Sequence, residues 1–493
     1  MLRKIRIALA TVFFLGLSLL FLDFTGVIHH WLGWMAKVQA LEAVLALNAV
    51  VVAALVVLTL VFGRIYCSVI CPLGVMQDLF GWLGRKAKKN RYNYSAEKRW
   101  LRYPILVVFI AALVAGGGTV VQLLAPYSAF GRIMTMILQP IWKWGNNVLA
   151  AIAESMDSYA FYEVDVWLKS VPVLIIATLT LVLLMVLAWR NGRTYCNTIC
   201  PVGTVLSFFS RFSLFKIHFD ADKCRNCSLC SKNCKAACID YKTHSVDHSR
   251  CVTCGDCLNS CKFGALKYGL SPKRKKTEEN GTPTDAGKRS FLVASAMVTT
   301  AAALAQEEKI VDGGFTDLED KVAPTRQTPL TPPGSLSDRN FSQRCTGCQL
   351  CVSECPNHVL RPSTDLMHLM QPTMSYERGF CRPECTRCSD VCPAGAIRPL
   401  DDIEKSSIQI GHAVWIKKNC IPVTKGVECG NCANHCPAGA IEMVALDEED
   451  EESPFVPAIN ESACIGCGAC EYVCPARPFS AIYVEGHEVH KTI

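Results

Sequence analysis

Several common signatures of redox enzymes are missing from this sequence. It has no CxxCH motif for covalent haem, no nucleotide-binding fingerprint and no molybdenum-binding motif. We therefore expect that any terminal substrate is reduced by another protein. Charged residues are also scarce, at 19%, whereas hydrophobic residues reach 51%. This balance favours a protein partly dissolved in lipid, and a chain of 493 residues should form several domains.

Long hydrophobic runs are present, and four of them could each cross a bilayer, which takes about 20 residues. They cover residues 5–24, 41–62, 103–125 and 171–189. Basic residues before the first run and in segment 85–102 predict that these ends face the cytoplasm. The sequence thus predicts an α-helical membrane domain over residues 1–219, with four spans in two repeated hairpins.

The membrane part is an internal duplication, because segment 63–74 recurs as segment 192–203 with the same CxxxCP motif. Cys67/Cys71 and Cys196/Cys200 are i, i+4 pairs, so each pair would share one face of a helix. Together they could hold one more cluster, form a thiol redox site, or pack as small buried residues. The regular spacing makes packing the weakest of the three readings. Arg64 and Arg193, before the two motifs, could tune the redox potential or bind lipid headgroups, but arginines at a cytoplasmic helix end need no special role.

Cysteine is the outlier of the composition, at 29 residues, and most cysteines fall into ferredoxin-like motifs. Thiolates ligate the iron corners of [4Fe–4S] clusters, and in paired motifs the fourth cysteine ligates the other cluster. Segment 220–270 therefore predicts a cytoplasmic two-cluster domain of the small α+β ferredoxin-like type. One cluster would use Cys224, Cys227, Cys230 and Cys261, and the other Cys251, Cys254, Cys257 and Cys234. Cys238 is an extra thiol that could instead replace Cys234.

Segment 341–493 carries four more motifs and predicts a four-cluster polyferredoxin domain. Their cysteines are Cys345, Cys348, Cys351 and Cys355; Cys381, Cys385, Cys388 and Cys392; Cys420, Cys429, Cys432 and Cys436; and Cys464, Cys467, Cys470 and Cys474. Motifs could pair consecutively, but we expect nesting, with the two irregular inner motifs paired inside the outer two. The total is six [4Fe–4S] clusters, or seven if the membrane cysteines hold one. Zinc would suit CxxC pairs but not this repeated pattern.

A linker over residues 271–340 contains a segment, 288–305, with the layout of an export signal: a basic start, a short apolar core and an A-x-A ending. Its start resembles a twin-arginine signal with lysine in place of the first arginine. A crossing here, as a cleaved signal or a fifth span, would place the four-cluster domain in the periplasm. A packed helix would leave that domain in the cytoplasm.

With these motifs in place, residues 1 to about 270 resemble the membrane subunit of the quinol-oxidising module of periplasmic nitrate reduction (NapH type). Residues from about 288 onward resemble its four-cluster subunit (NapG type, related to MauM ferredoxins). The resemblance implies a fused quinol dehydrogenase of the bacterial inner membrane, without its own terminal substrate site. It would take electrons from menaquinol or ubiquinol in the quinone pool and pass them to a periplasmic reductase or small carrier. Lipid is the other partner, and nucleic acid is not expected.

Two other functions fit the same motifs. The chain could supply electrons for maturation or regulation of a metalloenzyme, or act as a cytoplasmic-facing ferredoxin oxidase subunit. His29 and His30, in the loop predicted to lie outside, are best explained as interfacial residues; the alternative is that they accept quinol protons.

Overall fold

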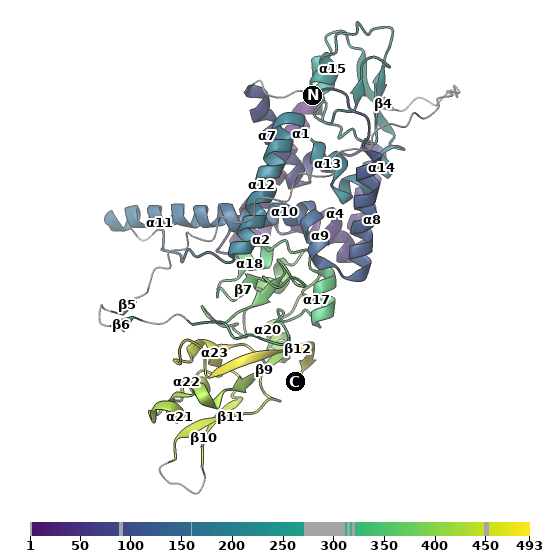
Figure 1. Ribbon diagram of the computed structural model, residues 1–493. Helices are drawn as coiled ribbons and strands as arrows, with labels where there is room; N and C mark the ends of the chain where they lie inside the picture. Colours follow the sequence, from purple (N-terminus) through teal and green to yellow (C-terminus); the bar gives the residue numbers. More distant parts are fainter. Residues whose placement is uncertain are drawn as a thin grey trace, which may run out of the picture.

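The computed structural model describes residues 2–87, 92–158, 160–270, 311–312, 316–317, 321–447 and 453–493. Its helical part lies between two smaller bodies (Figure 1). Residues 215–270 form the upper body, and residues 321–493 form the lower body, where the C-terminus lies. The predicted export-like segment 288–305 lies outside the described residues.

The helical part is built from the two sequence repeats. Its elements are α1 (Leu2–Leu22), α2 (Val27–Leu32), α3 (Trp34–Lys37), α4 (Ala40–Leu45), α5 (Ala49–Phe62), α6 (Tyr66–Val69), α7 (Pro72–Lys86), α8 (Arg99–Ala115), α9 (Gly118–Leu124), α10 (Pro126–Ile133), the π-helical turn η1 (Met134–Leu138), α11 (Gln139–Ser155), α12 (Val171–Asn191), α13 (Thr194–Thr198) and α14 (Pro201–Ser210). In each repeat a CxxxCP motif joins a four- or five-residue helix to a longer one that begins at the motif's proline, a residue suited to a first helical turn.

Two helices in the described part of the chain, α1 and α12, are long and apolar enough to cross a membrane. A third candidate is the pair α9 and 126–155, if its 78° bend lies within one span. The predicted spans 41–62 and 103–125 are each divided into two helices. The first breaks at Leu47, whose φ is +54°, and α5 restarts with Asn48 accepting the Val51 N–H. The second is interrupted by a glycine run, where α8 ends at Gly116 in the left-handed region (φ +79°).

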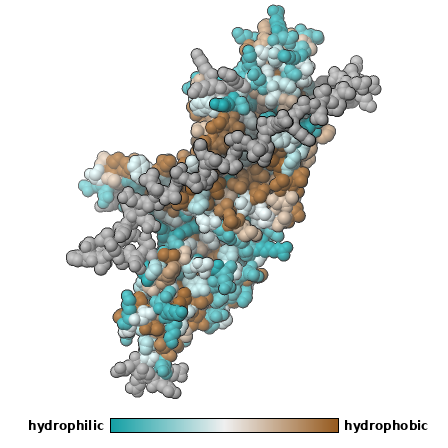
Figure 2. All heavy atoms as spheres, viewed as in Figure 1, coloured by the Kyte–Doolittle hydropathy of each residue, from teal (hydrophilic) through white to brown (hydrophobic). Residues whose placement is uncertain are grey.

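The outer surface of the helices is apolar. Side chains such as Ile5, Val57, Val107 and Val182 are more than two-fifths exposed. Figure 2 shows hydrophobic residues gathered across the middle of the molecule, with hydrophilic residues at its upper and lower ends. This distribution is compatible with a membrane protein.

The upper body consists of two strand pairs and a pair of short helices. β1 (Phe215–Phe219) pairs antiparallel with β4 (Leu266–Leu270), and β2 (Ile239–Asp240) with β3 (Ser245–Val246), while α15 (Leu229–Lys232) packs on α16 (Asp256–Ser260). It joins the helical part directly, because the Leu214 N–H donates to Leu60 O at 2.7 Å and the rings of Phe62 and Phe215 stack.

The lower body repeats this kind of unit. Before it in the chain, β5 (Val311–Asp312) and β6 (Thr316–Asp317) form a separate strand pair (Figure 1). The elements of the lower body are α17 (Asp338–Arg344), α18 (Leu350–Glu354), β7 (Leu360–Pro362), β8 (Pro372–Met374), α19 (Arg387–Val391), α20 (Asp402–Ser406), β9 (Ile408–Trp415), the 3-10 turn η2 (Lys417–Asn419), α21 (Ile421–Lys425), α22 (Asn431–Asn434), β10 (Ile441–Ala445), β11 (Phe455–Ile459), α23 (Ala469–Val473) and β12 (Ile482–Thr492). Antiparallel pairs join β5 to β6, β7 to β8, β9 to β12 and β10 to β11.

The lower body is docked on the helices by polar contacts made in a buried interface. Ser128 Oγ, on α10, donates to Thr346 O at 2.5 Å, and Lys169 Nζ donates to Val352 O at 3.0 Å. Gln139 Nε2 bridges Phe21 O and Ser353 O, at 3.1 and 3.3 Å. These bonds place the loop of the first C-terminal cysteine motif against the helical part.

Candidate functional site

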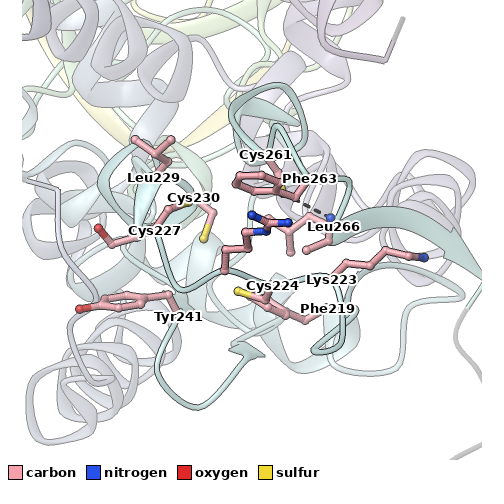
Figure 3. A pocket seen from close by; sticks show the side chains of 13 residues that line it. Phe219, Lys223, Cys224, Cys227, Leu229, Cys230, Tyr241, Cys261, Phe263 and Leu266 are labelled. Atoms are coloured by element: carbon pink, nitrogen blue, oxygen red, sulfur yellow. Dashed lines mark hydrogen bonds between the residues drawn. The ribbon is translucent and has the colours of Figure 1, made fainter.

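One cavity of the upper body is lined by four cysteines that the sequence assigns to a single cluster. Figure 3 shows Cys224, Cys227, Cys230 and Cys261 around it, with Leu229 and Phe263 among the apolar walls. Backbone N–H groups point at the sulfurs, from Asn226 to Cys224 at 3.4 Å and from Ala265 to Cys261 at 3.3 Å. Such N–H···S bonds stabilise the negative charge of cluster thiolates.

The second predicted set of the upper body also comes together. Burial raises the pKa of Cys257, and the neighbouring Cys254, Cys251 and Cys234 raise it further. Cys238 is buried against the same set, with its Sγ 3.6 Å from that of Cys234. The extra thiol therefore shares this site with the predicted ligand, and either sulfur is near enough to serve as the fourth ligand.

In the lower body the third and fourth motifs exchange their last cysteines. One cavity is lined by Cys420, Cys429, Cys432 and Cys474, and another by Cys436, Cys464, Cys467 and Cys470. Backbone N–H groups of Ala440 and Ala481 donate to Cys436 and Cys474, each at 3.3 Å.

The first and second motifs exchange partners in the same way. Burial raises the pKa of Cys348 to about 12, with Cys392 among the groups that raise it. Burial likewise raises the pKa of Cys381, with Cys355 contributing, and helices α18 and α19 pack together. Motifs therefore pair consecutively, and the expected nesting is wrong. The spacing of the cysteines could not show which motifs pair, because it contains no information on which helices pack together.

The two CxxxCP motifs of the helical part meet in the interior. Each of Cys67, Cys71, Cys196 and Cys200 is at most 5% exposed. Burial raises the pKa of Cys71 and Cys200, and other members of the quartet raise both further. The duplicated motifs thus form one buried quartet of thiols rather than two separate pairs.

Each motif is held by the arginine of the other. Arg64 donates to Cys196 O at 3.2 Å, and Arg193 donates to Cys67 O. Arg64 also lies 3.8 Å from Cys67 Sγ. A Cβ on Gly74 would meet Cys67 O at 2.3 Å, and one on Gly203 would meet Cys196 O at 2.4 Å. Both arginines are buried, so our expectation that they need no special role is wrong.

Sequence reasoning missed two residues around the quartet. Gln77, on α7, donates through Nε2 to Cys196 Sγ at 3.3 Å. Asp78 accepts from Arg193 Nε at 2.7 Å, from Lys235 Nζ at 2.6 Å and from Arg6 at 3.1 Å. Burial alone would raise the pKa of Asp78, but Arg193 and Lys235 hold it well below its usual range. The sequence offered one signal, because Lys235 stands where a proline usually follows the fourth cysteine of a ferredoxin motif. A proline has no side-chain cation and could not make this ion pair.

The cysteine sets fit clusters better than single ions. Among the described residues, no three His, Cys, Asp or Glu side chains converge on a point that would hold one metal ion. A [4Fe–4S] cluster does not require such convergence, because its four thiolates bind four different iron corners. Cavities lined by four cysteines, apolar walls and N–H···S bonds are what such a cluster needs.

Comparison with known families agrees with this chemistry. A family model described as a 4Fe-4S binding domain matches residues 44–91 and again residues 171–220, the two copies that carry CxxxCP. A model described as a 4Fe-4S dicluster domain matches residues 425–477, which hold most of the third and fourth motifs. No solved structure matches the chain.

Curated relatives include several ferredoxin-type proteins. The chain is 30% identical to the ferredoxin-type protein NapG of Escherichia coli over 38% of this chain and 81% of NapG. It is also 30% identical to the methylamine utilization ferredoxin-type protein MauM of Paracoccus denitrificans, over 33% and 75% of the two chains. Identity to MauM of Methylobacillus flagellatus is 32%, over 30% of this chain and 64% of that protein's length.

Proposed function

Because the chain belongs to the family of NapG and MauM ferredoxin-type proteins, we propose that it is a quinol dehydrogenase that passes electrons across the membrane to a periplasmic acceptor. It is an iron–sulfur electron-transfer protein with apolar helices suited to a membrane. The proposal adds the donor, the direction and the acceptor.

The position of the quartet carries the proposal. On one side, Arg64 beside Cys67 also donates to Ser249 O at 3.2 Å, two residues before Cys251. On the other side, Tyr195 of the second motif donates to Leu124 O at 3.2 Å, close to the helix that packs on the Cys348 loop. The quartet therefore lies between the cysteine sets of the upper and lower bodies.

We assign the ligands as the motifs predict, with consecutive pairing in the lower body. The 24 cysteines of the six ferredoxin motifs would hold six [4Fe–4S] clusters, and the quartet Cys67, Cys71, Cys196 and Cys200 a seventh. Such clusters carry one electron each. A quinol that becomes a quinone releases two electrons and two protons; bound clusters would accept the electrons singly, and the protons would go to water. The protein's own task is to hold the thiols in place and keep water from them.

For topology, we propose a membrane domain over residues 1–219 with four crossings, two of them interrupted, in the bacterial inner membrane. Arg3, Arg6 and Arg85 line one cavity together with residues of the upper body, which supports a cytoplasmic upper body. The apolar belt between the two bodies supports a periplasmic lower body. A reporter fused after Ile493 that is active only in the cytoplasm would overturn this orientation.

Iron and acid-labile sulfide analysis tests the ligand assignment. Anaerobically purified protein should contain about 28 iron atoms per chain, and a variant with serine at all four quartet positions about 24. Equal iron in both would mean that the quartet holds no cluster. A short-chain quinol should bleach the cluster absorbance of the wild-type protein; absence of bleaching in protein that dithionite still bleaches would refute the quinol dehydrogenase.

A further inference from the structure

A cavity of about 230 Å³ opens between α1, α7 and the upper body, next to the quartet. Its walls include Ile7 on α1 and Leu79 and Trp82 on α7, which are 42%, 46% and 48% exposed on the apolar surface of the helices. A molecule dissolved in the bilayer could therefore enter from the side. Small-molecule sites combine apolar walls with polar groups that fix the ligand's orientation, and here polar side chains such as Arg6 and Gln77 line the same cavity.

Two polar side chains that line the cavity have atoms without a hydrogen-bond partner. Gln77 is 1% exposed, and its Oε1 has no hydrogen-bond partner. Arg6 is 8% exposed, and its Nε also lacks a partner. Buried polar groups without partners are rare in folded proteins, so this pair calls for a ligand that both donates and accepts. A ring with a hydroxyl or carbonyl at each end meets that requirement.

Residues that line the cavity adjoin two of the cysteine sets. Gln77 lines the cavity, and its Nε2 donates to Cys196 Sγ of the quartet at 3.3 Å. Lys235 and Asp256 also line the cavity, and each directly neighbours a cysteine of the second upper-body set, Cys234 and Cys257. A ring bound there would lie beside two separate one-electron acceptors.

Three of the basic side chains that line the cavity are paired with carboxylates. Arg3 is paired with Asp256 at 2.9 Å, and Arg6 and Lys235 with Asp78 at 3.1 and 2.6 Å. Arg85 also lines the cavity and lies over the Tyr92 ring at 5.9 Å, so the lining has four basic and two acidic side chains. A lipid phosphate is therefore the competing ligand, and the experiment below distinguishes it from a quinone.

The second repeat cannot form the same site. Counted from the matching cysteines, Leu206 and Ser207 stand where the first repeat has Gln77 and Asp78. Leucine provides no amide between a cavity and a sulfur, so the duplication has diverged at this point, and only one of the two halves carries the polar end.

We propose that this cavity binds the ring of a membrane quinol, with Gln77 and Arg6 at its polar oxygens and the tail leaving between α1 and α7. This site rests on the proposed quinol dehydrogenase function and gives it a location. Oxidation there yields the quinone and two protons, which leave toward the cytoplasmic interface. The two electrons pass singly to [4Fe–4S] clusters.

Quinone binding can be measured without turnover, through Trp82. Titration of the oxidised full-length protein with decylubiquinone should quench tryptophan fluorescence saturably, and Trp82→Phe should remove most of that change. Val75→Phe, which fills the cavity, should abolish saturable quenching. Gln77→Leu should weaken affinity about tenfold, as expected for one hydrogen bond. The matched control is Val186→Phe, which enlarges a lipid-facing valine on α12 and should change nothing.

The outcomes separate the site from the function. If quinol bleaches wild-type clusters, but Val75→Phe and Gln77→Leu bind quinone and react like Val186→Phe, the site is wrong and the function stands. If quinone binding depends on these residues but quinol never reduces the clusters, the function fails and the site remains. Iron content equal to wild type shows that each variant is folded. Competition by phosphatidylglycerol vesicles, with no effect of added quinone, would make the cavity a lipid site and overturn the proposal.

Discussion

Replacing Asp78 by asparagine should loosen the upper body from the membrane helices. The carboxylate of Asp78 holds Arg193, whose side chain is 0% exposed, together with Lys235 and Arg6, at 7% and 8%. Asparagine keeps the size but leaves three buried cations without their shared anion. Breaking a buried ion pair by removing one partner typically costs about 3–5 kcal/mol, which corresponds to a factor of roughly one hundred to several thousand in a local opening equilibrium.

Hydrogen exchange followed by mass spectrometry, on the anaerobic full-length protein, measures this opening. The Arg193 N–H donates to Lys235 O at 2.8 Å, and the Ser95 N–H to Ala237 O at 3.3 Å, so these amides report directly on the contact between the helices and the upper body. Both should exchange faster in Asp78→Asn by about the factor given above. Lys235→Met should have a smaller effect, because Asp78 keeps Arg193 and Arg6.

The matched control is Lys223→Met, the same substitution in an exposed pair with Asp220, where little change is expected.

The pH dependence gives a second check. Arg193 and Lys235 hold the pKa of Asp78 below its usual range despite burial, so its contribution is complete above about pH 4 and is lost only below. The difference between the wild-type protein and Asp78→Asn should thus be constant from pH 6 to 8. Unchanged exchange in Asp78→Asn, or effects of Asp78→Asn and Lys235→Met that simply add, would refute the shared-anion reasoning.

Three further predictions concern other parts of the molecule. Gly74→Ala and Gly203→Ala should each lower the iron bound by the quartet, because the new methyl would meet a cysteine carbonyl, whereas Gly145→Ala on α11, with open space around it, should be neutral or slightly stabilising; equal iron in all three would contradict the close approach. Arg326→Met should destabilise the lower body by about 3–5 kcal/mol in thermal unfolding, since Arg326 makes a two-pronged bond to the buried Glu471. Burial raises the pKa of Glu471 and Arg326 opposes the rise, so the loss should be larger at pH 8 than at pH 5, and a loss independent of pH would count against an unpaired carboxylate. Removal of iron by an oxidant and chelator should abolish exchange protection in residues 321–493 while α1 and α12 keep theirs, because helices of five residues around cysteine cavities have little else to hold them.

The local part of this architecture could be predicted from sequence, and the long-range part could not. The cysteine sets of the upper body and the meeting of the two CxxxCP motifs follow from spacing and duplication. The breaks at Leu47 and Gly116 depend on single residues inside hydrophobic runs, which a window average does not detect. Consecutive pairing in the lower body, and the contacts of Gln77 and Asp78, depend on which helices pack, and one sequence does not contain that information.

The buried interface between the helices and the lower body has a consequence for assembly. Every residue of α10 is buried, and Ser128 on it bonds to a carbonyl of the cysteine loop. Before the lower body docks, the polar groups of this surface lack partners, so the membrane half is incomplete by itself. Carrying both halves on one chain turns docking into an intramolecular event, for which a tether commonly supplies an effective concentration on the order of millimolar. Two separate subunits would need either a larger interface or higher expression to reach the same occupancy.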